Sequence, residues 1–185
     1  ARAEVGYNPK KRGRPSYLPL LCLEGRSQDC WEGSYHPGDV HVSTITIPLL
    51  ERAFGKLPGR RGPVRVRADG AFFDHKIIEF IEGKEAFYAI VARLTHPLKH
   101  QLAGLRYRRV SPGLGAAEFW YCPHGWPGPR RLIVIRRPVP EEPSAQWHLF
   151  QMGGYSYQAL VTNLRLKALN LWRFYNQRAC AELII

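Results

Sequence analysis

The sequence predicts an α/β fold with an antiparallel β insertion, and three observations support this prediction. Between residues 17 and 92, strand-like apolar runs and capped helical segments follow in the order β-β-α-β-α-β. Between residues 93 and 151, short aromatic and β-branched runs alternate with Gly/Pro turns. The remaining residues return to a strand and then a helix. We therefore expect a core in 1–92, a β-rich insertion in 93–151 and the end of the core in 152–185.

The first predicted elements are two strands and a helix. The apolar run 17–23 indicates a buried strand. The run 29–35 indicates a second strand that ends at a Pro-Gly turn and pairs with the first. Ser43 or Thr44 is suited to cap a helix whose apolar positions continue to Phe54.

A strand, a helix and a second strand follow. Alternating apolar residues at 64–68 indicate a strand. Asp74 is suited to cap a short helix that runs to Glu82. The uninterrupted apolar run 86–92 indicates a strand that is buried on both faces.

The predicted insertion combines basic and aromatic side chains on short strands. Its strands are expected at 105–110, 118–122, 132–136 and 147–150. Its arginines include Arg106, Arg108, Arg109, Arg130, Arg131, Arg136 and Arg137, and its aromatic residues include Tyr107, Trp120, Tyr121 and Trp126. Such a surface is able to contact a nucleic-acid backbone and stack on exposed bases. A solvated charged face over an ordinary aromatic core is the alternative.

The formal net charge of +12 indicates a polyanionic partner, because folding does not require such an excess of positive charge. Nucleic acid is the first expectation, and a ribosome-like or heparin-like binder is the competing class. Residues 12–15 (Arg12-Gly13-Arg14-Pro15), in a basic segment that also contains Lys10 and Lys11, resemble the core of an AT-hook, which binds the DNA minor groove. The same segment also fits a charged lead-in to the first strand.

The four cysteines have no C-x-x-C spacing and no disulfide framework, so we expect reduced, mostly buried thiols in a cytoplasmic protein. The Cys122-Pro-His124 sequence has no partner pair at metal-ligand spacing, which favours a simple turn. No apolar run approaches the length of a membrane span, so we expect no membrane partner.

Asp69 is the first candidate functional residue. It directly follows the predicted strand 64–68, and Gly70 then lets the chain turn away. Open α/β sheets bind ligands at the carboxyl ends of their strands, so a carboxylate in this position is a candidate ligand or catalytic group. A turn-initiating Asp-Gly pair is the alternative.

A second group of candidates lies in the predicted helix 170–185. Tyr175, Arg178 and Glu182 are spaced by three and four residues, so a helix places them on one face. A hydroxyl, a guanidinium group and a carboxylate on one stripe suit a phosphate-bearing substrate and a metal ion. A surface helix with an ordinary Arg–Glu pair is the alternative.

With these residues, the chain resembles the DDE transposases of bacterial insertion sequences, in the group with a Tyr-x2-Arg-x3-Glu-x6-Lys signature. Residues 66–73 (Val-Arg-Ala-Asp-Gly-Ala-Phe-Phe) and 160–164 (Leu-Val-Thr-Asn-Leu) also look like that group. Residues 13–17 (Gly-Arg-Pro-Ser-Tyr) and 30–33 (Cys-Trp-Glu-Gly) look closest to the insertion-sequence family numbered thirteen-eighty. The resemblance implies a ribonuclease-H-like core, which is a mixed five-stranded sheet with helices on both sides and a β insertion.

The resemblance also implies an activity. It assigns Asp69 and Glu182 as the second and third members of an Asp-Asp-Glu triad that binds two Mg²⁺ or Mn²⁺ ions. It assigns Tyr175 and Arg178 to a DNA phosphate near the cut. The partners implied are double-stranded DNA, as element ends and target, and a second protomer assembled on that DNA. The first acidic residue would lie upstream of Ala1 and the signature lysine beyond Ile185, so we expect a fragment that is truncated at both ends and inactive alone.

Two other functions remain open at this stage. A non-catalytic DNA-binding module would need only the basic surface. A structure-specific nuclease or resolvase on the same scaffold would need the acidic residues as well.

Overall fold

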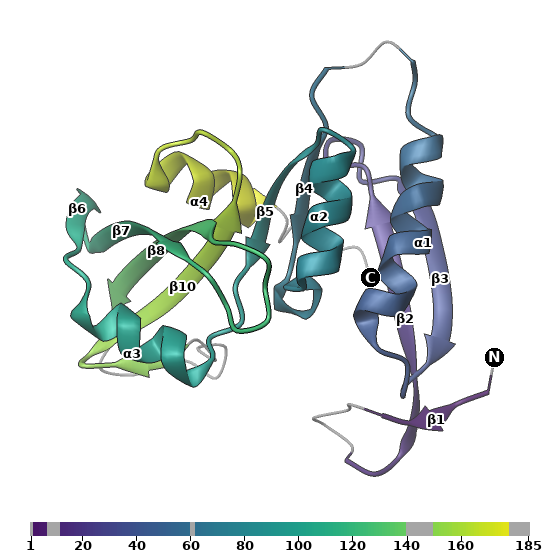
Figure 1. Cartoon of the computed structure of the whole chain (residues 1–185), viewed down its shortest axis with the longest axis horizontal. Helices are drawn as coiled ribbons and strands as arrows, with labels where there is room; N and C mark the ends of the chain where they lie inside the picture. Colours follow the sequence, from purple (N-terminus) through teal and green to yellow (C-terminus); the bar gives the residue numbers. More distant parts are fainter. Residues whose placement is uncertain (1, 7–11, 60–61, 140–149, 178–185) are drawn as a thin grey trace. The chain divides into compact units, whose positions relative to one another are not determined.

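The computed structural model describes residues 2–6, 12–59, 62–139 and 150–177 (Figure 1). Within these residues the protein is an α/β protein with a mixed sheet and four α-helices, as the sequence predicts at this level. The chain divides at Pro63 into two compact units, which are described separately.

The first unit contains three antiparallel strands and one helix. The strands are β1 (Glu4–Val5), β2 (Pro15–Leu23) and β3 (Cys30–Pro37), in the sheet order β1-β2-β3. The predicted pairing of the second and third strands is confirmed, with Leu20 opposite Ser34 and a register shift at Cys22/Leu23. Gly6 is required by close packing, because a Cβ atom there would lie 1.7 Å from the carbonyl oxygen of Gly38.

Helix α1 (Val42–Gly55) covers one face of this small sheet (Figure 1). The expected cap at Ser43 or Thr44 is wrong: His41 is the N-cap, and its Nδ1 atom accepts a hydrogen bond of 3.3 Å from the backbone N–H of Ser43. An imidazole nitrogen therefore replaces the usual hydroxyl or carboxylate acceptor, which propensity rules do not anticipate. Glu32 on β3 binds the end of α1 through Lys56 at 2.8 Å and Arg52 at 3.2 Å.

The opposite face of the β1–β3 sheet is apolar and exposed. Tyr17 and Leu21 are both 45% exposed and Tyr35 is 65% exposed, and the strand register puts all three on one face. The rings of Tyr17 and Tyr35 lie 5.3 Å apart. The prediction of a fully buried strand at 17–23 is therefore wrong, because α1 buries only the alternate face, where Leu20 is 6% exposed.

The second unit contains a seven-stranded sheet within the described residues. Its order is β4-β5-β10-β8-β7-β6, and β9 also pairs with β10. Only β4 and β5 are parallel. The strands are β4 (Arg65–Ala68), β5 (Phe87–Val91), β6 (Arg108–Ser111), β7 (Leu114–Tyr121), β8 (Arg130–Pro138), β9 (Phe150–Met152) and β10 (Tyr155–Thr162).

Helices cover both faces of this sheet. The short helix η1 (Gly70–Phe72), α2 (His75–Gly83) and α3 (His96–Gly104) follow β4 and β5, and α4 (Ala168–Asn176) follows β10. On the α2 face, Tyr88 and Ile90 are fully buried. On the other face, Leu171 and Tyr175 of α4 pack in a cluster with Ile133 and Leu160. The expectation that strand 86–92 is buried on both faces is confirmed.

Most predicted elements of this unit are present. Asp74 caps α2 as expected, and its carboxylate accepts a 2.9 Å hydrogen bond from the N–H of Lys76. The predicted strands at 105–110, 118–122 and 132–136 correspond to β6, β7 and β8, which continue the same sheet through β10. The helix α3 was not predicted, because the segment from residue 93 was interpreted as β-rich. The predicted strand 147–150 lies outside the described residues except for Phe150, which begins β9.

The cysteines are free thiols where they are described, but they are less buried than expected. Cys30 and Cys122 are exposed, which corrects the sequence-based expectation, and Cys22 is half-buried. Burial raises the pKa of the Cys22 thiol, with the neighbouring Cys30 as a smaller cause. Cys180 lies outside the described residues. None of the helices found in the described ranges has the length and hydropathy to cross a membrane.

Candidate functional site

Asp69 ends β4 and caps the helix that follows. Its Oδ1 atom accepts a 2.9 Å hydrogen bond from the N–H of Ala71, and its backbone is extended at φ −80° and ψ −176°. The turn-initiating role considered from the sequence is therefore real. It is compatible with metal binding, because two carboxylate oxygens can accept about four hydrogen bonds or metal contacts in total.

Arg67 connects the Asp69 strand to α4. It lies two residues before Asp69, so both side chains are on the same face of the extended chain. Its Nη1 atom donates a 3.1 Å hydrogen bond to the carbonyl oxygen of Phe174, and its guanidinium group lies 5.1 Å from the centre of the Phe174 ring. A cation at the carbonyl end of a helix is also favoured by the helix dipole. The last turn of α4 is therefore held against β4.

Tyr175 is mostly buried. It is 5% exposed and belongs to the core cluster beneath α4. Its ring therefore stabilises the packing of the helix, and its predicted contact with a DNA phosphate stays a prediction. Arg178 and Glu182 lie outside the described residues, so the expected approach of Asp69 and Glu182 stays a prediction as well.

An aromatic residue from another element packs beside the Asp69 segment. Trp126, in the connection between β7 and β8, lies 4.8 Å from the Phe73 ring and 6.2 Å from the His75 ring, measured between centroids. The sequence suggested Trp126 as a base-stacking residue, but its half-buried ring packs on the chain that leaves Asp69. Sequence spacing contains no signal for this contact, because the two segments are distant in the chain.

Arg130, a predicted DNA contact, belongs to an internal network. Its Nη2 atom lies 3.0 Å from Oε2 of Glu82, and the hydroxyl of Tyr88 donates a 2.9 Å hydrogen bond to Oε1 of the same carboxylate. Burial, followed by this carboxylate, raises the pKa of Tyr88. The network joins the end of α2 to β5 and β8.

Arg131, also a predicted DNA contact, is similarly held within the unit. It binds Glu118 through two parallel contacts, Nε to Oε1 at 2.7 Å and Nη2 to Oε2 at 3.0 Å. It also donates hydrogen bonds to the carbonyl oxygens of Leu164 and Leu166, in the connection before α4. The pair lowers the pKa of Glu118. Both arginines have side chains no more than 20% exposed. Their predicted contacts with DNA stay predictions, and exposed arginines are better placed for such contacts.

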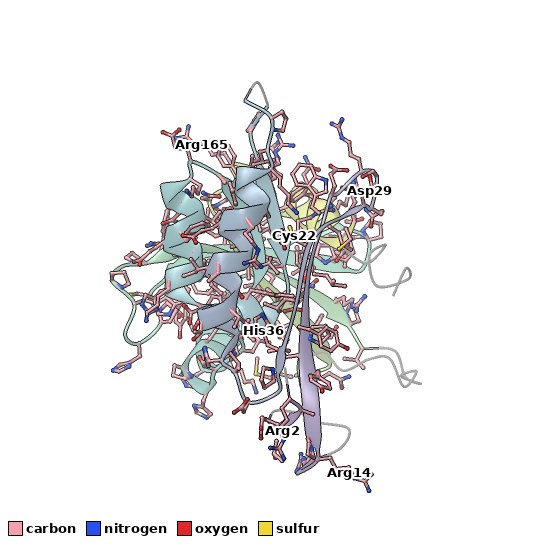
Figure 2. All side chains as sticks on the ribbon, turned by 90° about the vertical axis from the view of Figure 1, so that its right-hand side faces the viewer. Arg2, Arg14, Cys22, Asp29, His36 and Arg165 are labelled. Atoms are coloured by element: carbon pink, nitrogen blue, oxygen red, sulfur yellow. The ribbon has the colours of Figure 1, made fainter. Side chains whose placement is uncertain are left out.

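The other predicted DNA contacts are exposed where they are described. Arg108 and Arg109 are exposed on β6, and Arg106 is exposed just before that strand. Trp120 on the neighbouring strand β7 is 67% exposed. In the first unit, Arg12 and Arg14 are exposed just before β2, and Arg14 projects away from the strands in Figure 2. Lys10 and Lys11 lie outside the described residues.

Arg136, in contrast, is enclosed by aromatic rings. Its guanidinium carbon lies 4.2 Å from the centre of the Tyr107 ring and 4.5 Å from that of Tyr155. Such stacking of a cation on aromatic faces is stabilising. Gly115 makes room for it, because a Cβ atom there would come within 3.2 Å of the Arg136 side chain. Burial raises the pKa of Tyr107 at the same place.

Of the two residues predicted to bind a metal ion, Asp69 and Glu182, only Asp69 is among the described residues. Asp69 supplies a carboxylate, which is a hard ligand suited to Mg²⁺ or Mn²⁺. The second expected ligand, Glu182, is not among the described residues. In the portions of the chain that the structure describes, no group of three or more His, Cys, Asp or Glu side chains is arranged to hold a metal ion.

A scan of the sequence against models of known protein families finds no match, and a search of curated proteins finds none either.

Proposed function

We propose that this chain is part of the catalytic domain of a DDE transposase, which cuts DNA at insertion-sequence ends and joins them to target DNA in a metal-dependent reaction. The observation that carries the proposal is the contact of Arg67 with Phe174. It connects the strand that ends in Asp69 with the helix in which the Tyr-Arg-Glu signature begins. A shared active site requires this strand and this helix to lie next to each other.

The topology supports a ribonuclease-H-like core for this domain. The β2–β3 hairpin, α1, β4, α2 and β5 follow in the order that the sequence predicts, and the parallel pair β4–β5 makes its sheet mixed, as the resemblance implies. The antiparallel strands β6, β7 and β8 come between Asp69 and the signature helix, where the resemblance implies an insertion.

In this proposal the acidic residues hold the metal ions, and the basic residues hold DNA. Asp69 and Glu182 ligate Mg²⁺ or Mn²⁺, with a third acidic residue supplied by a longer protein. Bound metal ions would activate the attacking oxygen and stabilise the leaving oxygen at the phosphate. Tyr175 and Arg178 orient that phosphate, and exposed arginines such as Arg108 and Arg109 contact the DNA backbone. Two protomers assemble on double-stranded DNA, and the protein acts on the bacterial nucleoid in the cytoplasm.

The first test compares two aspartates with the same local role. Asp69 and Asp74 both cap a helix through a 2.9 Å hydrogen bond to the N–H two residues later. Asn also caps helices well, so Asp→Asn keeps this bond and removes only the charge. In a longer protein that extends this chain at both ends, we expect Asp69→Asn to reduce Mg²⁺-dependent cleavage of element ends by roughly a thousandfold or more. Asp74→Asn is expected to stay within about threefold of the unchanged protein.

A second measurement uses the present chain. Paramagnetic Mn²⁺ should broaden the amide NMR signals of Gly70 and Ala71, and Asp69→Asn should weaken this broadening while Asp74→Asn leaves it unchanged. Equal broadening in all three proteins, together with equal cleavage by both variants of the longer protein, would show that Asp69 only caps η1.

A non-catalytic DNA-binding module is the second candidate, and the exposed Arg108, Arg109 and Trp120 on neighbouring strands favour it. DNA binding without any cleavage, unchanged by Asp69→Asn, would support this module. Cleavage of any branched DNA, without preference for element ends, would instead support a structure-specific nuclease or resolvase.

A further inference from the structure

A small cavity lies between α4 and two strands of the second unit. Its volume is about 150 Å³. The side chains around it come from β8, β10 and α4, and they are Ile135, Arg137, Ser156, Gln158, Trp172 and Asn176. None of these residues belongs to the candidate catalytic set.

The cavity forms where one face of the sheet changes from apolar to polar. On this face, Ile133 pairs with Leu160 in the core cluster beneath α4. Further along the same strands, Gln158 lies opposite Ile135 and Ser156 lies opposite Arg137. The polar residues replace the large apolar side chains that would otherwise fill the space beneath the helix. Trp172 and Asn176 are four residues apart on α4, so both face this region.

Two hydrogen bonds orient the polar groups of the cavity. Nε of Arg137 donates to Oγ of Ser156 at 3.3 Å, and that serine is 1% exposed. The indole N–H of Trp172 donates to Oε1 of Gln158 at 2.9 Å. Because the carbonyl end of the Gln158 amide accepts this bond, the other end of the amide is an NH₂ group, which can only donate.

The chemistry of the lining favours an anion. Among the described residues, the lining has one guanidinium group and two side-chain amides, and it includes neither Asp nor Glu. A guanidinium group with neighbouring amide donors suits the oxygens of a phosphate.

The size of the cavity restricts the ligand further. A water molecule takes roughly 30 Å³ of liquid, and pockets for drug-sized ligands measure about 300–1,000 Å³. A cavity of about 150 Å³ is therefore large enough for one phosphate group and smaller than the pockets that enclose drug-sized ligands.

We propose that this cavity binds a single phosphate group of the DNA backbone and so positions the duplex beside α4, β8 and β10. The proposal rests on the proposed function, since it identifies DNA as the source of the phosphate. It adds Gln158 and Asn176 as DNA-positioning residues that the sequence motifs do not identify, and it assigns Arg137, one of the insertion arginines, to one phosphate group.

The test follows the indole N–H signal of Trp172 by NMR, assigned among the five tryptophans by its loss in Trp172→Phe. Inorganic phosphate is titrated against chloride at equal ionic strength, and a short DNA duplex is titrated separately. Asn176→Leu fills the cavity without changing the charge, and Arg137→Gln removes the charge. Arg93→Gln, at an exposed position in the connection after β5, is the charge-matched control.

We expect phosphate and the duplex, but not chloride, to shift the Trp172 signal in the unchanged protein and in Arg93→Gln. Phosphate affinity should fall at least about tenfold in both cavity variants. Arg137→Gln removes a charged donor to the phosphate oxygens, and Asn176→Leu removes the space for the phosphate group. The signals of the other tryptophans report whether each variant is folded. If Arg137→Gln does not fold, Asn176→Leu still tests the proposal.

A shift by chloride equal to that by phosphate, or unchanged affinity in folded Asn176→Leu, would overturn the proposal. Duplex binding without a Trp172 response would also overturn it while leaving the proposed function intact. Phosphate binding with no duplex binding by the chain would instead contradict the proposed function and assign the cavity to free phosphate.

Discussion

At the scale of single residues, the arginines of the second unit divide into two groups that look alike in the sequence. Arg108 and Arg109 are exposed on β6, whereas Arg131 binds Glu118 and two backbone carbonyl groups. A guanidinium group in this setting connects β7, β8 and the chain before α4. Its planar fork is essential there, because an ammonium group cannot form the two parallel contacts.

This difference predicts a stability effect for a conservative substitution. Arg131→Lys should lower the free energy of unfolding by about 1–3 kcal/mol, because the carbonyl groups of Leu164 and Leu166 lose donors and the two parallel contacts with Glu118 are lost. Arg109→Lys, on the exposed strand β6, should change it by less than about 0.5 kcal/mol. Urea unfolding followed by circular dichroism measures both. Equal stability of the two variants would show that the Arg131 contacts are no stronger than those of a surface residue.

At the scale of elements, the contact of Glu32 with α1 makes the first unit sensitive to pH. The nearby Lys56, followed by Arg52, lowers the pKa of Glu32. The folded state therefore favours the charged carboxylate. This contribution to stability is complete above the pKa of the unfolded chain, about 4.3 for Glu, and is lost as the pH falls through the lower pKa of the folded state.

We therefore expect Glu32→Gln to lower the melting temperature at pH 7 and to have a smaller effect once the pH falls below the lowered pKa of the folded state, because Glu32 is then protonated in both states. Glu51→Gln is the matched control, since Glu51 is an exposed carboxylate on α1. Thermal unfolding between pH 3 and 7 tests this. An effect of Glu32→Gln that does not vary with pH would refute the electrostatic explanation.

Local patterns predicted most elements because their signals are contained within a few residues. The cap at Asp74 and the alternation in β4 are examples. The cap at His41 and the helix α3 were missed for different reasons. His41 acts through a ring nitrogen that is uncommon as a cap, and α3 lies in a segment whose overall composition favours strands. Pro97 near the start of α3 is the local signal that was available.

At the scale of the whole molecule, the net charge of +12 governs the expected association with DNA. Each phosphate contact releases counterions, so the logarithm of the binding constant falls with the logarithm of the salt concentration by about 0.9 per contact. Arg108→Gln should reduce this slope by about one unit if the arginine contacts a phosphate. Folded Arg131→Gln should leave the slope nearly unchanged, because its guanidinium group is held by Glu118.

Fluorescence anisotropy with a labelled duplex at several salt concentrations measures these slopes. A reduction of the same size in both variants would mean that the arginines contribute only through total charge. The proposed contact of Arg108 with the DNA backbone would then lose its support.

The sequence by itself determined the charge, the order of most elements and the local role of Asp74, because each depends on composition or on neighbours within one or two turns of chain. It also indicated Asp69 as the end of a strand and Tyr175 as part of a helix. Only the tertiary structure decided that Arg67 joins β4 to α4, that Arg130 and Arg131 are paired internally, and that Tyr175 is buried. The physical reason is that these contacts join residues far apart in the chain, and strand register and helix packing bring them together.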